Sequence, residues 1–169
     1  MKTLLLMRHA KSDWDARYGA DHDRPLNDRG VRSARLMGRV LSEDGAQPDL
    51  VISSTALRAR STAEHVVEAG RWDAAIRLDP NLYGTGPDAA LVVASGAPDV
   101  GRLMMIGHQP TWSRLVTTLT GSSVVMKTAT IAVIEFPVES WADMSDNGEI
   151  AAVYQPRDYF GTALDEISL

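Results

Sequence analysis

The feature that most constrains the fold is a repeated alternation between short apolar runs and segments with helical periodicity. Apolar runs occupy residues 4–7, 50–52 and 103–106, and each is followed by a stretch with apolar side chains at helical spacing. Runs this short are typical of buried parallel strands. After the second run, Ser54 or Thr55 can cap the helix that follows. The alternation predicts a three-layer α/β domain.

The rest of the chain continues the same pattern with a weaker signal. Residues 75–78 form a candidate strand, and a helix is expected near residues 88–95. Residues 130–136 and 150–154 have the composition of closing strands. Because no repeat, low-complexity tract or linker interrupts the pattern, we expect residues 1–169 to form a single domain with a substantial core.

The composition excludes several classes of function. The chain has no cysteine, which rules out a disulfide scaffold and a thiolate metal site. Its net charge of -5 argues against nucleic acid and anionic lipid as partners. The first apolar run is shorter than the about 7–15 residues of a secretory signal, and no run approaches the ~18 residues of a membrane span. We therefore expect a cytoplasmic protein, and the sequence indicates no oligomeric state.

Polar side chains follow each of the three apolar runs. Arg8 and His9 follow the first run, Arg58 lies about one turn into the helix after the second, and His108 follows the third. In parallel α/β sheets, ligands bind beyond the carboxyl ends of the strands. Two of the helices that begin there also present free N–H groups to the same rim. The pattern predicts a site for a phosphoryl group.

Each side chain has a chemical role in such a site. Arg8 and Arg58 are permanently charged and can form paired hydrogen bonds with phosphate oxygens. Two neighbouring arginines disfavour a protonated imidazole, so His9 is expected to be neutral and nucleophilic at neutral pH. His108 is expected to donate a hydrogen bond to the charge that develops on the transferred oxygens.

Other polar residues are weaker candidates. Ser12 either donates to phosphate or caps a turn, and Arg24 either faces the site or pairs with Asp23 or Asp28. Both are kept as candidate substrate-binding residues. The carboxylates of residues 13, 15 and 21 are possible proton donors. His22 lies between two aspartates, but adjacent loop residues are a poor metal cage, so no metal site is expected.

Five segments between residues 4 and 113 resemble the histidine phosphatase superfamily, whose members are phosphoglycerate-mutase-like. They read LLLMRHAKSDW, DRPLNDRG, VISSTALRARSTAE, LYG and MMIGHQPT, and they are most similar to the SixA-type phosphohistidine phosphatases. The resemblance implies a six-stranded, mostly parallel mixed sheet and chemistry without a metal or other cofactor. It implies that His9 is the phosphorylated nucleophile, with Arg8, Arg58 and His108 as the other catalytic residues.

The sequence departs from the superfamily at two positions. Ala10 stands where many members have glycine, although alanine is frequent in the SixA-like branch. Many members also place an acidic proton donor shortly before a Tyr-Gly pair, where this chain has Pro80 before Tyr83; Asp79 and Asp88 lie nearby, but not at the matching place. A site without an acid favours a leaving group that needs no proton from the enzyme, such as the imidazole of phosphohistidine.

The short stretch between Arg58 and His108 also leaves little chain to build a lid, and an open site can admit a side chain of another protein. We therefore expect a phosphatase that uses a phosphohistidine intermediate and acts on phosphohistidine in proteins. Two alternatives remain open: hydrolysis of a small phosphorylated molecule, and a non-catalytic module that binds phosphoproteins. Phosphate or sulfate is expected to bind in the site.

Overall fold

The computed structural model describes residues 1–166, which form a six-stranded mixed sheet in the order β3-β2-β4-β1-β5-β6. The pairs β2–β3, β2–β4 and β1–β4 are parallel, whereas β5 runs antiparallel to both β1 and β6. The sheet is therefore mostly parallel, as predicted. The strands are β1 (Lys2–Arg8), β2 (Leu50–Ser54), β3 (Ala75–Asp79), β4 (Arg102–Gly107), β5 (Ile131–Phe136) and β6 (Glu149–Tyr154).

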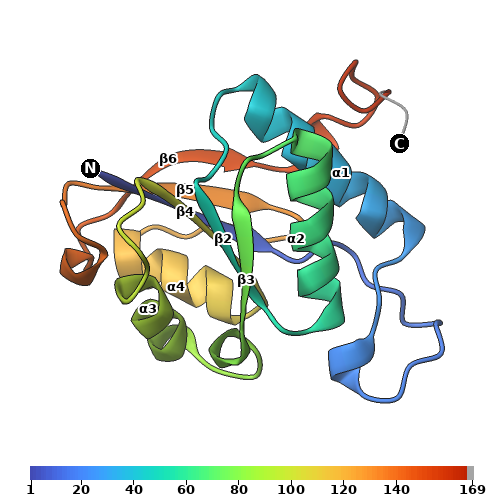
Figure 1. Ribbon diagram of the computed structural model, residues 1–169, viewed down its shortest axis with the longest axis horizontal. Coiled ribbons are helices and arrows are strands. Elements are labelled where there is room, and N and C mark those ends of the chain that lie inside the picture. Colours follow the sequence, from blue (N-terminus) through green and yellow to red (C-terminus); the bar gives the residue numbers. More distant parts are fainter. Residues whose placement is uncertain (167–169) are drawn as a thin grey trace.

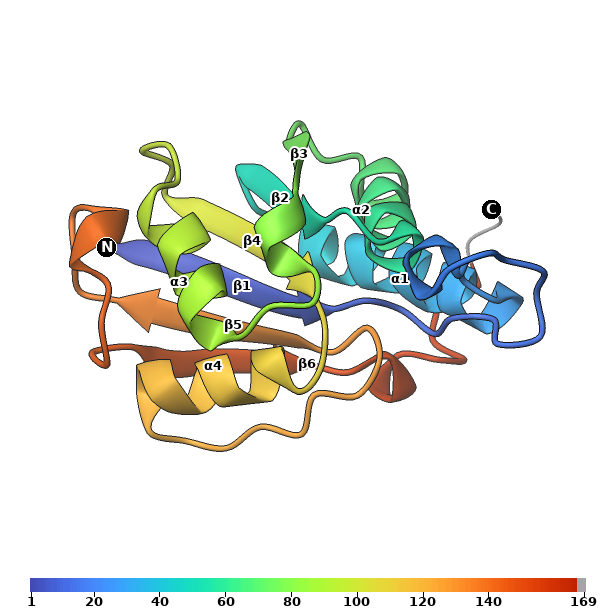
Figure 2. The same cartoon turned by 90° about the horizontal axis from the view of Figure 1, so that it is seen from below.

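Four α-helices cover the two faces of the sheet and complete the predicted three layers. Helices α1 (Asp28–Glu43) and α2 (Leu57–Gly70) lie side by side on one face. Helices α3 (Pro87–Ser95) and α4 (Thr111–Thr120) lie on the other, as Figures 1 and 2 show. Short 3-10 helices occur at Asp21–Asp23, Pro80–Leu82, Trp141–Asp143 and Pro156–Asp158.

Strand β1 contributes to two hydrophobic cores because its side chains alternate between the faces of the sheet. Leu4 and Leu6 pack with residues of α3 and α4, whereas Leu5 and Met7 pack with residues of α1 and α2. All four side chains are fully buried. The continuous apolar run thus reflects a strand covered on both sides, which is the physical reason why it was recognisable in the sequence.

Helix α4 is fixed against the end of β1 by Trp112. Its indole Nε1 donates a hydrogen bond to the Met7 carbonyl at 2.9 Å, and the ring is fully buried. The ring packs so closely on Gly107 that a Cβ there would lie 2.7 Å from it. This contact holds the start of α4 beside the carboxyl end of β4. No helix within residues 1–166 is long and apolar enough to cross a lipid bilayer.

The predicted cap of α2 is wrong. Ala56 occupies the cap position and provides no side-chain hydrogen bond to the helix. Ser54 instead accepts a 3.2 Å hydrogen bond from the Ala56 N–H and places its hydroxyl 2.8 Å from Nε2 of His108. Ser54 is fully buried at the end of β2, so its hydroxyl serves the strand ends rather than the first turn of the helix.

Candidate active site

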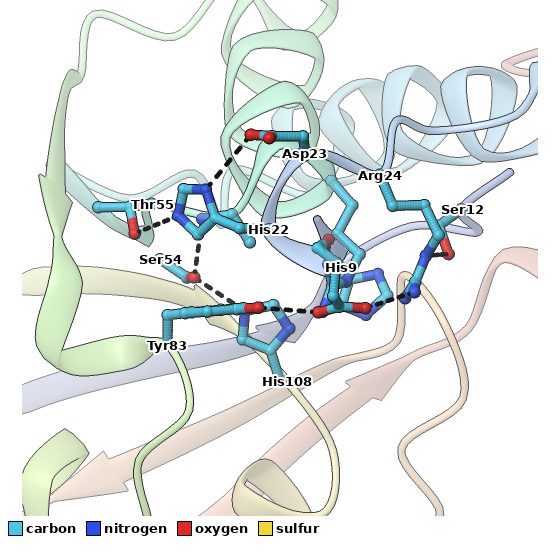
Figure 3. Close-up of polar contacts among 12 residues, drawn as sticks. His9, Ser12, His22, Asp23, Arg24, Ser54, Thr55, Tyr83 and His108 are labelled. Carbon is cyan, nitrogen blue, oxygen red and sulfur yellow. Dashed lines mark hydrogen bonds and ion pairs between the residues drawn. The ribbon is translucent and has the colours of Figure 1, made fainter. Parts of the chain in front are cut away.

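Three neighbouring strands bring the predicted site residues to one edge of the sheet. Arg8 ends β1 and is paired in register with Gly107, the last residue of β4, so His9 and His108 follow adjacent strands. Their ring centroids are 5.2 Å apart. Arg58 comes from the first turn of α2, after the next strand, β2. Figure 3 shows the two imidazoles facing a common space.

His9 has one ring nitrogen committed and one available for chemistry. Its Nδ1 lies 2.7 Å from the carbonyl oxygen of Ala10. A carbonyl can only accept, so in the neutral ring Nδ1 carries the hydrogen and Nε2 carries the lone pair. His9 is 6% exposed and lines a cavity, so its imidazole and the lone pair on Nε2 are held in a fixed orientation.

The pKa of His9 is lowered to about 3, chiefly by burial. The Ala10 hydrogen bond has a smaller, raising effect on this pKa, and His108, Arg58 and Arg8 lower it further. Burial likewise lowers the pKa of His108 to about 4, with Arg58 as the next cause. Both imidazoles are therefore neutral at pH 7. The expectation of a neutral His9 agrees with this result, but desolvation, and not the arginines, is its main cause.

His108 has one ring nitrogen in a hydrogen bond and one without a partner. Its Nε2 is 2.8 Å from the Ser54 hydroxyl, and its Nδ1 is buried without a hydrogen-bond partner. The ring also meets Tyr83 edge-on, with centroids 5.6 Å apart. Ser54 and Tyr83 therefore fix the orientation of an imidazole that still has hydrogen-bonding capacity.

Each of the two arginines has one N–H group in a hydrogen bond and another without a partner. Arg8 donates from Nη1 to the Met126 carbonyl at 3.1 Å, and Arg58 donates from Nη1 to the Asp21 carbonyl at 2.9 Å. The Nε groups of both are buried without a partner. Buried donors are normally paired, so unpaired donors on two arginines beside two histidines indicate a site for an anion.

Asp21 links several of these groups, and nothing in its sequence context indicated this. Its carboxylate pairs with Arg58 at 3.1 Å and with Arg24 at 2.6 Å, and it accepts a hydrogen bond from the Tyr83 hydroxyl at 2.9 Å. Burial alone would raise the pKa of Asp21, but the Tyr83 hydrogen bond and the charge of Arg58 hold it below the ordinary value. Asp21 is therefore ionised at neutral pH and orients arginines, so its role as a candidate proton donor is not supported.

The two weaker candidates, Ser12 and Arg24, contact each other. Arg24 donates from Nε to the Ser12 hydroxyl at 2.9 Å, and its guanidinium lies 3.5 Å from the centre of the Trp14 ring. The salt bridge of Arg24 goes to Asp21, so the alternative pairings with Asp23 and Asp28 are wrong. Both candidates line the same cavity as His9. Figure 3 shows the contact between Arg24 and Ser12 beside His9.

The site residues surround a cavity of about 480 Å³. Within residues 1–166, its lining contains five cationic side chains and no carboxylate. A volume of this size exceeds that of one phosphoryl group and leaves room for the group that carries it. The lining comprises Arg8, His9, Lys11, Ser12, Trp14, Arg24, Arg58, His108, Gln109, Lys127 and Thr128.

The remaining histidines lie outside this cavity. His22 places Nε2 2.8 Å from the Thr55 hydroxyl, and His65 lies on α2 near Arg35. The described part of the chain contains no group of three or more His, Asp or Glu side chains arranged to hold a metal ion. Asp79 caps the short helix at Pro80–Leu82, and Asp88 lies in the first turn of α3.

Comparison with known proteins places this geometry in a family. The profile of the histidine phosphatase superfamily (branch 1) matches residues 4–84. A solved structure from Nakamurella multipartitia, provisionally named phosphohistidine phosphatase SixA, is 32% identical and superposes with a TM-score of 0.78 over 92% of this chain and 96% of that one. The protein histidine phosphatase SixA complexed with tungstate is 25% identical, with a TM-score of 0.76 over 92% of this chain and 98% of that one.

The chain also has a relative of similar sequence. An uncharacterized protein of Mycobacterium tuberculosis is 41% identical over 118 residues, which is 69% of this chain and 72% of the relative. The fold, the paired histidines at adjacent strand ends and these similarities define a protein of the phosphoglycerate-mutase-like class. The chain belongs to the histidine phosphatase superfamily, and within it to the SixA-type branch.

Proposed function

We propose that this protein is a phosphohistidine phosphatase that acts on phosphorylated proteins through a covalent intermediate on His9. The observation that carries the proposal is the neutral imidazole of His9, whose Nδ1–H is engaged by Ala10 and whose Nε2 is free beside the arginines. A module that only bound phosphate would need the arginines but no oriented nucleophile. The tungstate complex of the SixA relative supports the binding of an oxyanion.

In the first step, the Nε2 lone pair of His9 attacks the phosphorus atom, and the bond between phosphorus and the substrate nitrogen breaks. The electron pair of that bond stays on the substrate imidazole, which leaves neutral when its other nitrogen carries a proton. Arg8 and Arg58 bind the transferred oxygens through their unpaired Nε groups. His108 donates to the same oxygens when its Nδ1 carries the hydrogen, which requires that Nε2 accept from Ser54.

In the second step, water attacks the phosphorus of phosphorylated His9. The bond from phosphorus to Nε2 breaks, the electron pair returns to Nε2, and inorganic phosphate leaves after water loses a proton to solvent or phosphate. The Ala10 carbonyl keeps Nδ1 protonated throughout, so His9 can leave as a neutral imidazole. The cycle uses water, the Ala10 carbonyl and the side chains already named.

The absence of an acid in the cavity lining favours phosphohistidine over phosphate esters. An alkoxide leaving group requires a proton, which enzymes commonly supply from a carboxylic acid. Within residues 1–166 no carboxyl group lines the cavity, and nearby Asp21 is held ionised. The pKa of the Tyr83 hydroxyl is raised, chiefly by its hydrogen bond to Asp21, so Tyr83 is a poor proton donor. A phosphoramidate bond does not depend on such a donor.

The test compares three substrates with the purified protein: a phosphohistidine peptide, an alkyl phosphate and p-nitrophenyl phosphate. We expect the phosphohistidine peptide to be hydrolysed much faster than the alkyl phosphate, and a phosphoenzyme to accumulate under an acid-free quench. His9→Ala should lower turnover by about 10⁴ or more, as loss of a nucleophile does. His65→Ala is the matched control, because this histidine lies outside the cavity.

Two results would contradict the proposal. Alkyl phosphate hydrolysis as fast as that of phosphohistidine would indicate the small-molecule alternative and an unrecognised proton donor. Tight phosphopeptide binding with no turnover would indicate the non-catalytic module.

A further inference from the structure

A second, smaller cavity adjoins the candidate active site. It encloses about 130 Å³ between the first turns of α1, the segment before β5 and the segment after β6. Lys127 and Thr128 line both this cavity and the larger one. A volume of this size has room for a carboxylate or phosphate group. The cavity is therefore a compartment beside the active site.

The charged side chains around this second cavity are cationic. Arg29, Lys127 and Arg157 line it, and within residues 1–166 no carboxylate does. Arg157 is 3.9 Å from Asp158, whereas Arg29 and Lys127 have no carboxylate within 4.0 Å in the described part of the chain. The Arg29 guanidinium lies 4.6 Å from the centre of the Phe160 ring, which supports it on one side. In a chain of net charge -5, this is a local positive field.

Two polar side-chain atoms of the second cavity are buried and unpaired. Thr130 is fully buried, and its Oγ1 has no hydrogen-bond partner. The Oε1 of Gln155 is also buried without a partner. The threonine hydroxyl can donate, and an amide can turn to present its NH₂ group. Buried unpaired groups are rare, so two of them in one small compartment with exposed cations indicate a site that a polar ligand completes.

The second cavity is tied to the nucleophile through the main chain. The Ala129 N–H donates to the carbonyls of both Arg8 and His9 at 3.1 Å. Arg8 in turn donates from Nη1 to the Met126 carbonyl. Residues 126–130 therefore hold a fixed position relative to His9, and a group bound in the small cavity keeps a defined place relative to the phosphorus.

We propose that the second cavity binds an acidic side chain of the substrate protein, close in sequence to its phosphohistidine. This inference rests on the proposed function and names what the enzyme recognises beyond the phosphoryl group. The cavity of about 480 Å³ takes the phosphorylated imidazole, and the one of about 130 Å³ takes the carboxylate of a neighbouring aspartate or glutamate. Arg29 and Lys127 provide the charge, and Thr130 and Gln155 provide the hydrogen bonds.

The experiment uses a series of phosphohistidine peptides in which one glutamate is moved through the five positions on each side, each matched by a glutamine peptide. At the position that reaches the second cavity, we expect kcat/KM to exceed that of the glutamine peptide by about three- to tenfold, the range for partly exposed charge-assisted contacts. The gain should fall mainly on KM. Arg29→Gln and Thr130→Val should each reduce the glutamate-to-glutamine ratio toward one.

Arg77→Gln is the matched control, because Arg77 is an exposed arginine on the edge strand β3 and lies outside both cavities. It should leave the glutamate-to-glutamine ratio as in the parent. The inference is overturned if no glutamate position gives more than a twofold gain, or if the gain survives in both Arg29→Gln and Thr130→Val. If no peptide is turned over, the proposed function fails instead. The acidic subsite is then tested by measuring with fluorescence anisotropy how tightly the same peptides bind to the His9→Ala variant. Equal affinities for the glutamate and glutamine peptides would refute the subsite.

Discussion

Lowering the pH from 8 to 5 should destabilise the fold substantially, because two histidines of the candidate active site resist protonation. His9 and His108 have folded-state pKa values of about 3 and about 4, against an ordinary value of 6.5. The unfolded chain therefore binds two protons between pH 6.5 and about 4 that the folded chain does not bind. Stability falls as pH falls wherever the unfolded state binds more protons.

The size of the effect follows from the two pKa values. Each proton that binds only to the unfolded state costs about 1.4 kcal/mol per pH unit below 6.5. At pH 5 this is about 2 kcal/mol for each histidine and about 4 kcal/mol for both. The total is large against a usual unfolding free energy of about 5–15 kcal/mol. The depressed pKa of Asp21 acts only nearer its ordinary value of 3.8, so it lies outside this window.

The assay is urea denaturation at fixed temperature and ionic strength across pH 5 to 8. Between pH 8 and 5, the unfolding free energy of the double variant His9→Gln/His108→Gln should fall by about 4 kcal/mol less than that of the parent. His65→Gln is the control, and its effect should be smaller because this imidazole is less buried, although burial lowers its pKa as well. Parent stability that is constant within about 1 kcal/mol from pH 8 to 5, or an equal slope in the double variant, would refute the reasoning.

Three substitutions give further predictions. Asp21→Asn should lower kcat/KM about tenfold in steady-state kinetics, because the orientation of Arg58 is loosened. This loss is smaller than the loss of about 10²–10³ that follows removal of a direct oxyanion donor. An unchanged kcat/KM would separate the ion pair from catalysis. Gly107→Ala should destabilise the fold by about 1–3 kcal/mol in urea, because its Cβ would lie 2.7 Å from the Trp112 ring. Trp14 is 69% exposed at the cavity rim, so Trp14→Ala should raise KM for a phosphohistidine peptide severalfold with little change in Tm. An unchanged KM would leave the rim without a binding role.

Much of the sheet was predictable because burial on both faces leaves a continuous apolar run. That signal identified β1, β2 and β4, and with them the strand ends that carry His9 and His108. The signal was weaker for β3, an edge strand whose residues are partly exposed. The meeting of the polar side chains at one rim followed from the parallel arrangement alone.

The contacts between loops were not predictable, because no local spacing encodes them. Asp21 pairs with Arg58 across 37 positions and with Tyr83 across 62, and only the folded path of the segment 10–27 brings them together. For the same reason, the predicted partners of Arg24 were wrong, and the contact of Ser54 with His108 was not predicted. The catalytic roles of Arg8, His9, Arg58 and His108 remain predictions, and the kinetics of His9→Ala test the role of His9.

The central place of β1 has a consequence for how the protein is made. Its neighbours are β4 and β5, so Thr3 pairs with Arg102 and Met7 with Ile131, across about a hundred residues of chain. Contacts between such distant segments form slowly during folding. On the ribosome, the first strand must therefore wait until residues 131–136 have emerged before it gains both partners. Until then its apolar side chains remain open to chaperones and to aggregation.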